Sequence, residues 1–108
     1  YLNNQIKTNI MITNSNYSLG VTTVYVINSG KTVLDISRID SYLDSEFIPR
    51  NDTNRTIAIE ASTDITNPGL WDPDEIVKIE INKVLGAGQH RVAVATQYGN
   101  KDEELFSI

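Results

Sequence analysis

The chain of 108 residues contains no cysteine, and histidine and tryptophan occur once each. Without cysteine it can form neither a disulfide nor a zinc–thiolate site, and it offers no thiol nucleophile. No stretch approaches the roughly 20 apolar residues that cross a bilayer, so we expect no membrane contact by these residues themselves. The nine lysines and arginines form no cluster and are outnumbered by 14 acids, which gives a net charge of −5. Nucleic acids and anionic membranes are therefore poor candidates as partners.

Sequence motifs of enzyme active sites are also missing. We find no G-x-S-x-G, no H-E-x-x-H and no glycine-rich phosphate loop. His90 has no neighbouring motif to join, and we expect it to be exposed or packed on a hairpin. The sequence predicts a chain without enzymatic activity and without a cofactor or metal.

Two local features have an alternative functional interpretation. The segment Asp72-Pro73-Asp74-Glu75 could offer oxygen ligands to Ca²⁺, but it lacks the alternating ligands of a calcium loop. We favour a β-turn entered through Pro73 with solvated carboxylates. Trp71 could be a stacking platform for a sugar, but a single tryptophan more often packs over the end of a core.

What the chain has is a series of short apolar segments with turn residues about every ten positions. Alternating apolar and polar residues predict β-strands, and no segment carries the 3.6-residue stripe of a helix. Residues 14–20 are polar and predict a turn region. We expect an all-β, immunoglobulin-like antiparallel β-sandwich of seven or eight short strands, with residues 1–108 forming a single domain. The expected strands are residues 5–13, 21–27, 39–44, 56–61, 77–81, 91–97 and 104–108, with a short edge segment at 47–49.

One polar residue interrupts the apolar row of the segment SRIDSYLD at 37–44. Ile39 and Leu43 point to one face of the expected strand, and Ser41 lies between them on the same face. A buried hydroxyl without a partner costs about 1 to 3 kcal/mol. We therefore expect Ser41 at a sheet edge or a subunit surface. The predicted patch for a partner or for self-association consists of Ile39, Ser41, Tyr42, Leu43 and Phe47.

Three Asn-x-Ser/Thr triplets begin at Asn16, Asn51 and Asn54. Such triplets are acceptors for N-glycosylation, so these three residues are candidate glycosylation sites. One or two triplets arise by chance in a chain rich in asparagine and threonine, and they favour an extracellular protein only slightly.

Longer segments resemble a known family. Residues 22–49, TTVYVINSGKTVLDISRIDSYLDSEFIP, resemble the block of the archaellum accessory proteins FlaF and FlaG. That block runs as an aliphatic strand, Asn-x-Gly, a Thr/Leu-Asp step and an alternating strand that ends in Asp. WDPDEIVKIEI at 71–81 and LGAGQHRVAVATQYG at 85–99 resemble the closing hairpins of the same family. The strand around Ser41 slightly favours FlaG over FlaF.

The resemblance implies a sandwich that follows an N-terminal membrane helix, so we expect an ectodomain between the cell membrane and the surface layer. It implies a stator part of the archaeal motility motor that binds the surface-layer protein, the sister accessory protein, or a second copy through an edge strand as a homo-oligomer. Two alternatives stay open: the outer domain of an archaeal filament subunit, and an unrelated extracellular adhesin or carbohydrate-binding module.

Overall fold

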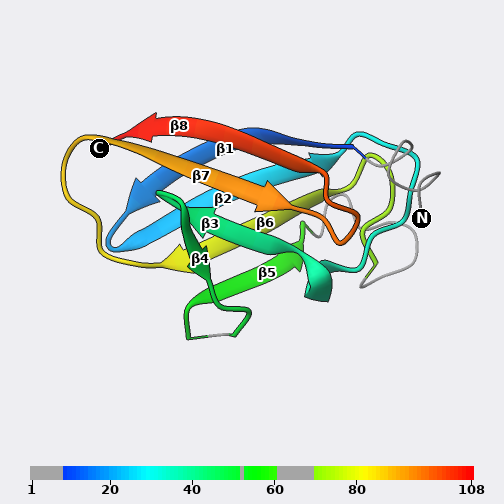
Figure 1. The fold of residues 1–108 in the computed structure, drawn as a ribbon, viewed down its shortest axis with the longest axis horizontal. Helices are drawn as coiled ribbons and strands as arrows, with labels where there is room; N and C mark the ends of the chain where they lie inside the picture. Colours follow the sequence, from blue (N-terminus) through cyan, green and yellow to red (C-terminus); the bar gives the residue numbers. More distant parts are fainter. Residues whose placement is uncertain (1–8, 52, 61–69) are drawn as a thin grey trace.

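The computed structural model describes residues 9–51, 53–60 and 70–108. These residues form two four-stranded antiparallel sheets, in the orders β1-β2-β6-β5 and β4-β3-β7-β8, which pack face to face (Figure 1). The all-β sandwich expected from the sequence is confirmed. In the described part of the chain, no helix has the length and apolarity needed to cross a membrane. The elements are β1 Ile10–Ser18, β2 Val21–Asn28, the 3₁₀ helix η1 Ile36–Arg38, β3 Asp40–Leu43, β4 Glu46–Ile48, β5 Arg55–Ile59, β6 Ile76–Asn82, β7 Gln89–Ala95 and β8 Lys101–Ser107.

The core lies between the two sheets and follows from the alternation of the strands. Every second residue of β2 and β6 is buried, and the intervening residues are half-buried or exposed on the outer face. Trp71 closes one end of the core with no exposed surface, and its indole Nε1 donates to the Glu75 carbonyl at 2.7 Å. The interpretation of Trp71 as a core residue is confirmed. The fully buried aliphatic residues include Val24, Val26, Ile39, Leu43, Val77, Ile79, Ile81, Val92 and Val94.

Strand β1 extends further toward the C-terminus than the sequence predicts, and residues 5–8 of the predicted strand lie outside the described residues. Residues 14–18 were expected to be a turn, but they continue β1 along the edge of its sheet. The pairing register with β2 shifts by one residue between Ile12 and Asn14, which marks a β-bulge. The true turn is only Leu19-Gly20, where both residues have positive φ, 51° and 80°. Residues 14–18 are mostly polar because an edge strand exposes many of its side chains to solvent.

Strands β1 and β8 lie side by side at one seam between the sheets, although they belong to different sheets (Figure 1). Two carboxylates of β8 bridge this seam. Asp102 Oδ2 accepts the Ile12 backbone N–H at 2.8 Å, and Glu104 Oε1 accepts the Ser15 hydroxyl at 3.0 Å. Asp102 occupies a backbone N–H at the edge of β1, and charged side chains at an edge hinder the addition of a foreign strand there.

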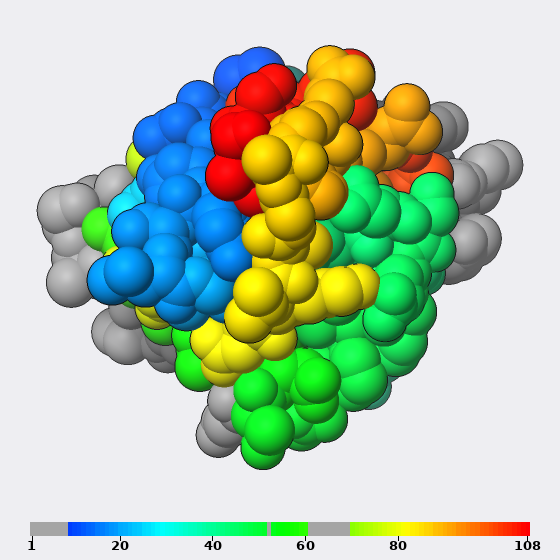
Figure 2. Space-filling model, turned by 90° about the vertical axis from the view of Figure 1, so that its left-hand side faces the viewer, coloured from blue at the N-terminus to red at the C-terminus, as the bar shows by residue number. Residues whose placement is uncertain are grey.

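The connection from β6 to β7, residues 83–88, crosses one end of the sandwich. Figure 2 shows it as a yellow-to-orange strip between the blue β1–β2 hairpin and the green β3–β4 hairpin. The backbone N–H of Lys83 donates to the Gly20 carbonyl at 3.1 Å, and the backbone N–H of Leu85 donates to the Tyr17 hydroxyl at 3.0 Å. Both bonds hold the connection on the β1–β2 hairpin, and Lys83 Nζ lies 2.8 Å from Glu46 Oε2 on the β3–β4 hairpin, so the connection joins hairpins of both sheets.

Candidate functional site

Strand β3, which holds most of the predicted interaction patch, is not an edge strand. It pairs with β4 on one side and with β7 on the other. Ser41, Ile39 and Leu43 are fully buried in the core. The expectation that Ser41 lies at a sheet edge or subunit surface is therefore wrong, and Ile39 and Leu43 are core residues that no partner can reach in the folded domain.

A partner from the opposite sheet explains the serine. Arg55 on β5 is 3% exposed, and its guanidinium Nη1 donates to the Ser41 hydroxyl at 3.3 Å. Burial lowers the pKa of Arg55, and the nearby charge of Arg50 lowers it further. A hydroxyl in the apolar row thus supplies an acceptor for a buried cation. No local sequence pattern shows this contact, because 14 residues separate the two side chains.

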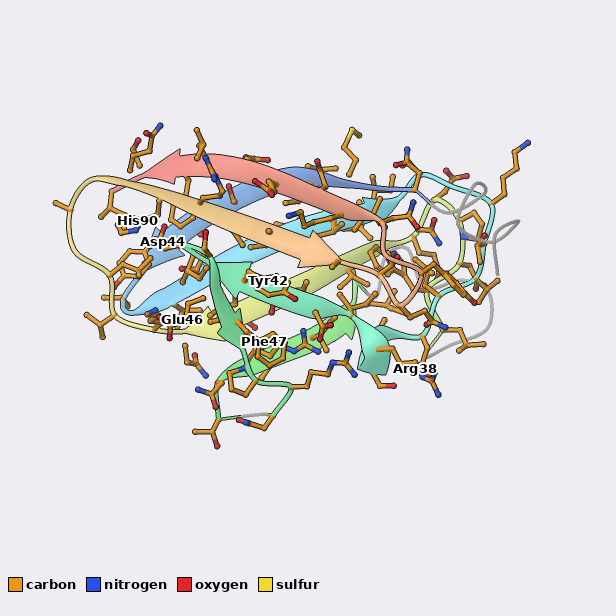
Figure 3. The ribbon with its side chains drawn as sticks, in the orientation of Figure 1. Arg38, Tyr42, Asp44, Glu46, Phe47 and His90 are labelled. Carbon is orange, nitrogen blue, oxygen red and sulfur yellow. The ribbon has the colours of Figure 1, made fainter. Side chains whose placement is uncertain are left out.

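The other two residues of the predicted patch, Tyr42 and Phe47, do lie on the surface. They face each other across β3 and β4 on the outer side of the sheet, and their ring centroids are 5.7 Å apart in an edge-to-face arrangement (Figure 3). Phe47 is 48% exposed although it is a large apolar side chain. The turn between the two strands is Asp44-Ser45, with positive φ at both residues, which is the geometry of a tight two-residue hairpin.

An open groove of about 410 Å³ runs over the outer side of the same sheet, next to Tyr42. Its floor is made by Ala93 and Ala95, which β7 presents on the outer face in alternation with its buried valines Val92 and Val94. Neighbouring strands carry larger side chains, so the two alanines leave a depression. The groove residues are Tyr42, Ser45, Arg91, Ala93, Ala95, Gly99, Lys101 and Glu103. We call this surface, together with Phe47, the outer groove face.

Charged side chains line the groove on the β8 side. Glu103 accepts from Lys101 Nζ at 2.9 Å and lies 3.6 Å from Arg91 Nε. The hydrogen bond from Lys101 and its charge lower the pKa of Glu103, with a smaller contribution from the charge of Arg91. Asp40, on the outer face of β3, accepts from Arg50 Nε at 2.6 Å. Ala93, Ala95 and these charges were not predicted as site residues, although the alternation of Val92, Ala93, Val94 and Ala95 shows in the sequence that the two alanines share one face.

His90 is not an isolated surface residue. Its Nδ1 lies 2.6 Å from Asp44 Oδ2 and its Nε2 lies 2.8 Å from the Gly86 carbonyl oxygen, so both ring nitrogens face acceptors. Its ring also packs on Phe106, with centroids 5.8 Å apart. Figure 3 shows the His90 and Asp44 side chains together at one end of the sandwich.

The two acceptors change the proton affinity of this pair. The Asp44 carboxylate and then the Gly86 carbonyl raise the pKa of His90. The His90 ring and then the Arg91 backbone N–H lower the pKa of Asp44. The imidazolium form of His90 is therefore more favoured than in a free histidine, and the contact with the Gly86 carbonyl holds the connection 83–88.

The acidic segment after Trp71 forms the expected turn, since the backbone N–H of Glu75 donates to the Asp72 carbonyl at 3.1 Å. The carboxylates of Asp72 and Glu75 are not solvated as predicted, because the two residues are 7% and 3% exposed. The Asp72 backbone N–H donates to Glu75 Oε1 at 2.8 Å. Within residues 9–51, 53–60 and 70–108, no group of three potential metal ligands is close enough to hold an ion.

The candidate glycosylation residues are not part of the groove lining. Asn16 is exposed on edge strand β1. Asn51 is exposed in the β4–β5 connection, where its Oδ1 accepts the backbone N–H groups of Thr53 and Asn54. Asn54 itself is half-buried. Glycosylation at these positions stays a prediction.

Comparison with known proteins gives a clear result only at the level of structure. No protein-family model and no curated protein matches the sequence. The fold is similar to the archaellum periplasmic stator protein FlaG from Sulfolobus acidocaldarius, with a TM-score of 0.71 and 16% identity, over 92% of this chain and 99% of that chain. It is similar also to a chain of the archaellum periplasmic stator protein complex of FlaF and FlaG from the same organism, with a TM-score of 0.72 and 16% identity, over 90% of this chain and 87% of that chain. The resemblance to FlaF and FlaG noted in the sequence is thus matched by a likeness in fold.

Proposed function

We propose, from the fold shared with periplasmic stator proteins of the archaellum, that this domain is a non-catalytic accessory part of an archaeal motility motor. The observation that carries the proposal is the likeness to FlaG and to the FlaF–FlaG complex over at least 90% of the chain. In this function the domain lies outside the cell membrane, beneath a surface layer, and acts by binding other proteins.

The sister accessory protein is the first partner that we propose. The name of one structural neighbour describes a complex of FlaF with FlaG, which supports a contact between two sandwich domains. We place this contact on the outer groove face because Phe47 is exposed beside Tyr42, and aromatic residues are the usual energetic centres of protein interfaces.

Anchorage to the surface-layer protein and self-association belong to the same proposal as further contacts of a stator. Strand β3 cannot mediate strand addition because both of its edges are paired. Self-association through an edge would therefore use β4 or β5, since the carboxylates of β8 occupy edge groups of β1 at the other seam.

Co-purification with the sister accessory protein of the same organism tests the proposal. We expect the two purified domains to elute together, and we expect Tyr42→Ser and Phe47→Ser each to weaken the complex by about thirtyfold, the effect of losing a hot-spot side chain. Matched controls are Tyr25→Ser and Met11→Ser, which change an aromatic and an exposed apolar residue on the other sheet. Binding to a glycan array without binding to the sister protein would support the carbohydrate-binding alternative instead.

A further inference from the structure

The outer groove face has a charge opposite to that of the whole chain. The charged side chains that line the groove are two cations, Arg91 and Lys101, and one acid, Glu103, which gives the lining a net charge of +1. The chain as a whole carries −5. A positive groove on an acidic protein attracts an acidic partner and orients it during encounter.

We propose that the outer groove face binds an acidic segment of a partner protein, whose carboxylate takes the place between Arg91 and Lys101 that Glu103 occupies in the free domain. This inference rests on the proposed function, because it names the chemistry of the partner surface. It goes further in assigning the contact to specific charges.

The Glu103 carboxylate occupies the position that we propose for a partner carboxylate. Its two carboxylate oxygens are divided between two cations, with Oε1 2.9 Å from Lys101 Nζ and Oε2 3.6 Å from Arg91 Nε. Both cationic side chains are more than half exposed, and the Glu103 side chain is 38% exposed. Exposed ion pairs contribute little to stability, so a partner carboxylate can replace Glu103 with little loss.

The rest of the groove suits a protein segment better than a polyanion. Strands β3, β7 and β8 are paired in continuous ladders beneath it, so recognition must come from side chains rather than from strand addition. The alanine floor and the Tyr42 ring offer an apolar contact beside the charges. A nucleic acid makes many phosphate contacts to a run of cations, and the groove lining contains only two.

The test compares charge variants in two binding assays. The first uses the purified sister accessory domain, and the second uses an NMR titration of the isotope-labelled domain with a decapeptide of alternating glutamate and alanine. We expect Arg91→Ala and Lys101→Ala to weaken both interactions about five- to tenfold, because each removes a cation that faces the bound carboxylate. We expect Glu103→Gln to strengthen both about three- to tenfold, because it removes the competing carboxylate. Higher salt should weaken both.

The other sheet provides matched controls, since Lys78 and Glu80 form a comparable ion pair on its outer face, 4.0 Å apart. Lys78→Ala and Glu80→Gln should leave both interactions unchanged, and the glutamine–alanine decapeptide should not bind. Peptide binding with these variant effects supports the inference even if the sister domain does not bind, in which case only the proposed function fails. Sister-domain binding that is unaffected by the three groove variants overturns the inference and leaves the proposed function intact. A different outcome would point to a sugar ligand. If Glu103→Gln weakens binding, and the domain binds a glycan array in a way that the groove variants weaken, the inference of an acidic protein segment is overturned.

Discussion

The buried contact between Ser41 and Arg55 predicts a strong energetic coupling between two residues on opposite sheets. Ser41→Val removes the hydroxyl that accepts from Arg55, and Arg55→Met removes the charge while it keeps an apolar stem of similar length. Each single variant leaves the other polar group buried without this partner. The double variant leaves neither, and its two apolar side chains can pack against each other.

The size of the effect follows from the geometry. A hydrogen bond to a charged group contributes about 1.5 to 3 kcal/mol, and a distance of 3.3 Å places this one near the lower end. Burial of the additional methyl group of valine stabilises the fold by up to about 0.8 kcal/mol, which offsets part of this loss. We therefore expect each single variant to lower the free energy of unfolding by about 1 to 2 kcal/mol. The double variant should lie close to the wild type, because apolar replacement of a buried polar pair is often neutral.

Urea unfolding of the four proteins measures the coupling. Trp71 is the single tryptophan and is fully buried, so its fluorescence reports loss of the core. If the two single effects add to within about 0.5 kcal/mol in the double variant, the residues are not coupled and the role assigned to Ser41 is wrong. Sedimentation velocity should give the same monomer or oligomer for Ser41→Val as for the wild type, because the side chain at position 41 cannot reach a partner.

Three further predictions follow from the core, the His90 contact and the seam. Leu43→Ala should lower the free energy of unfolding by about 2 to 5 kcal/mol, whereas Phe47→Ala, at an exposed position, should change it by less than about 1 kcal/mol in the same urea assay. Thermal stability should be greatest between about pH 4 and 6.5. The pKa of His90 is raised in the fold, so its contact stabilises the fold below the ordinary value of 6.5, and this stabilisation is lost as the pH rises. The pKa of Asp44 is lowered in the fold, so its contact stabilises the fold above the ordinary value of 3.8, and this stabilisation is lost as the pH falls. His90→Gln should remove the decline on the alkaline side, and an unchanged profile would contradict the role of this contact. Asp102→Ala should expose an edge N–H of β1 and increase aggregation measured by light scattering, and a variant that remains as dispersed as the wild type would show that the carboxylate does not guard the edge.

Much of the fold could be predicted from the alternation of apolar residues. The strand with Val77, Ile79 and Ile81 is recognisable because its period of two is uninterrupted. The pattern does not show where polar residues line an edge strand, and for that reason residues 14–18 were mistaken for a turn. The bulge after Ile12 also shifts the alternation by one residue, which hides the continuity of β1.

The candidate site was predicted only in part. Tyr42 and Phe47, two members of the predicted patch, lie on the surface. Ser41 was misplaced because a polar residue in an apolar row has two explanations, a solvent-facing edge or a buried partner. The partner is Arg55, on the opposite sheet, and a single sequence contains no pairing information for contacts between sheets. The groove charges come from β7 and β8, which lie far along the chain from Tyr42, so only the fold brings them together.

The seam between the first and last strands has a mechanical consequence. Strands β1 and β8 run in the same direction along the long axis, so a pull on the two ends of the domain loads the seam in shear (Figure 1). Shear engages the Asp102–Ile12 and Glu104–Ser15 hydrogen bonds together rather than one after another. These bonds are made by side chains with freedom to adjust and not by a rigid backbone ladder. The seam is therefore expected to stretch before it breaks when the two ends of the domain are pulled apart.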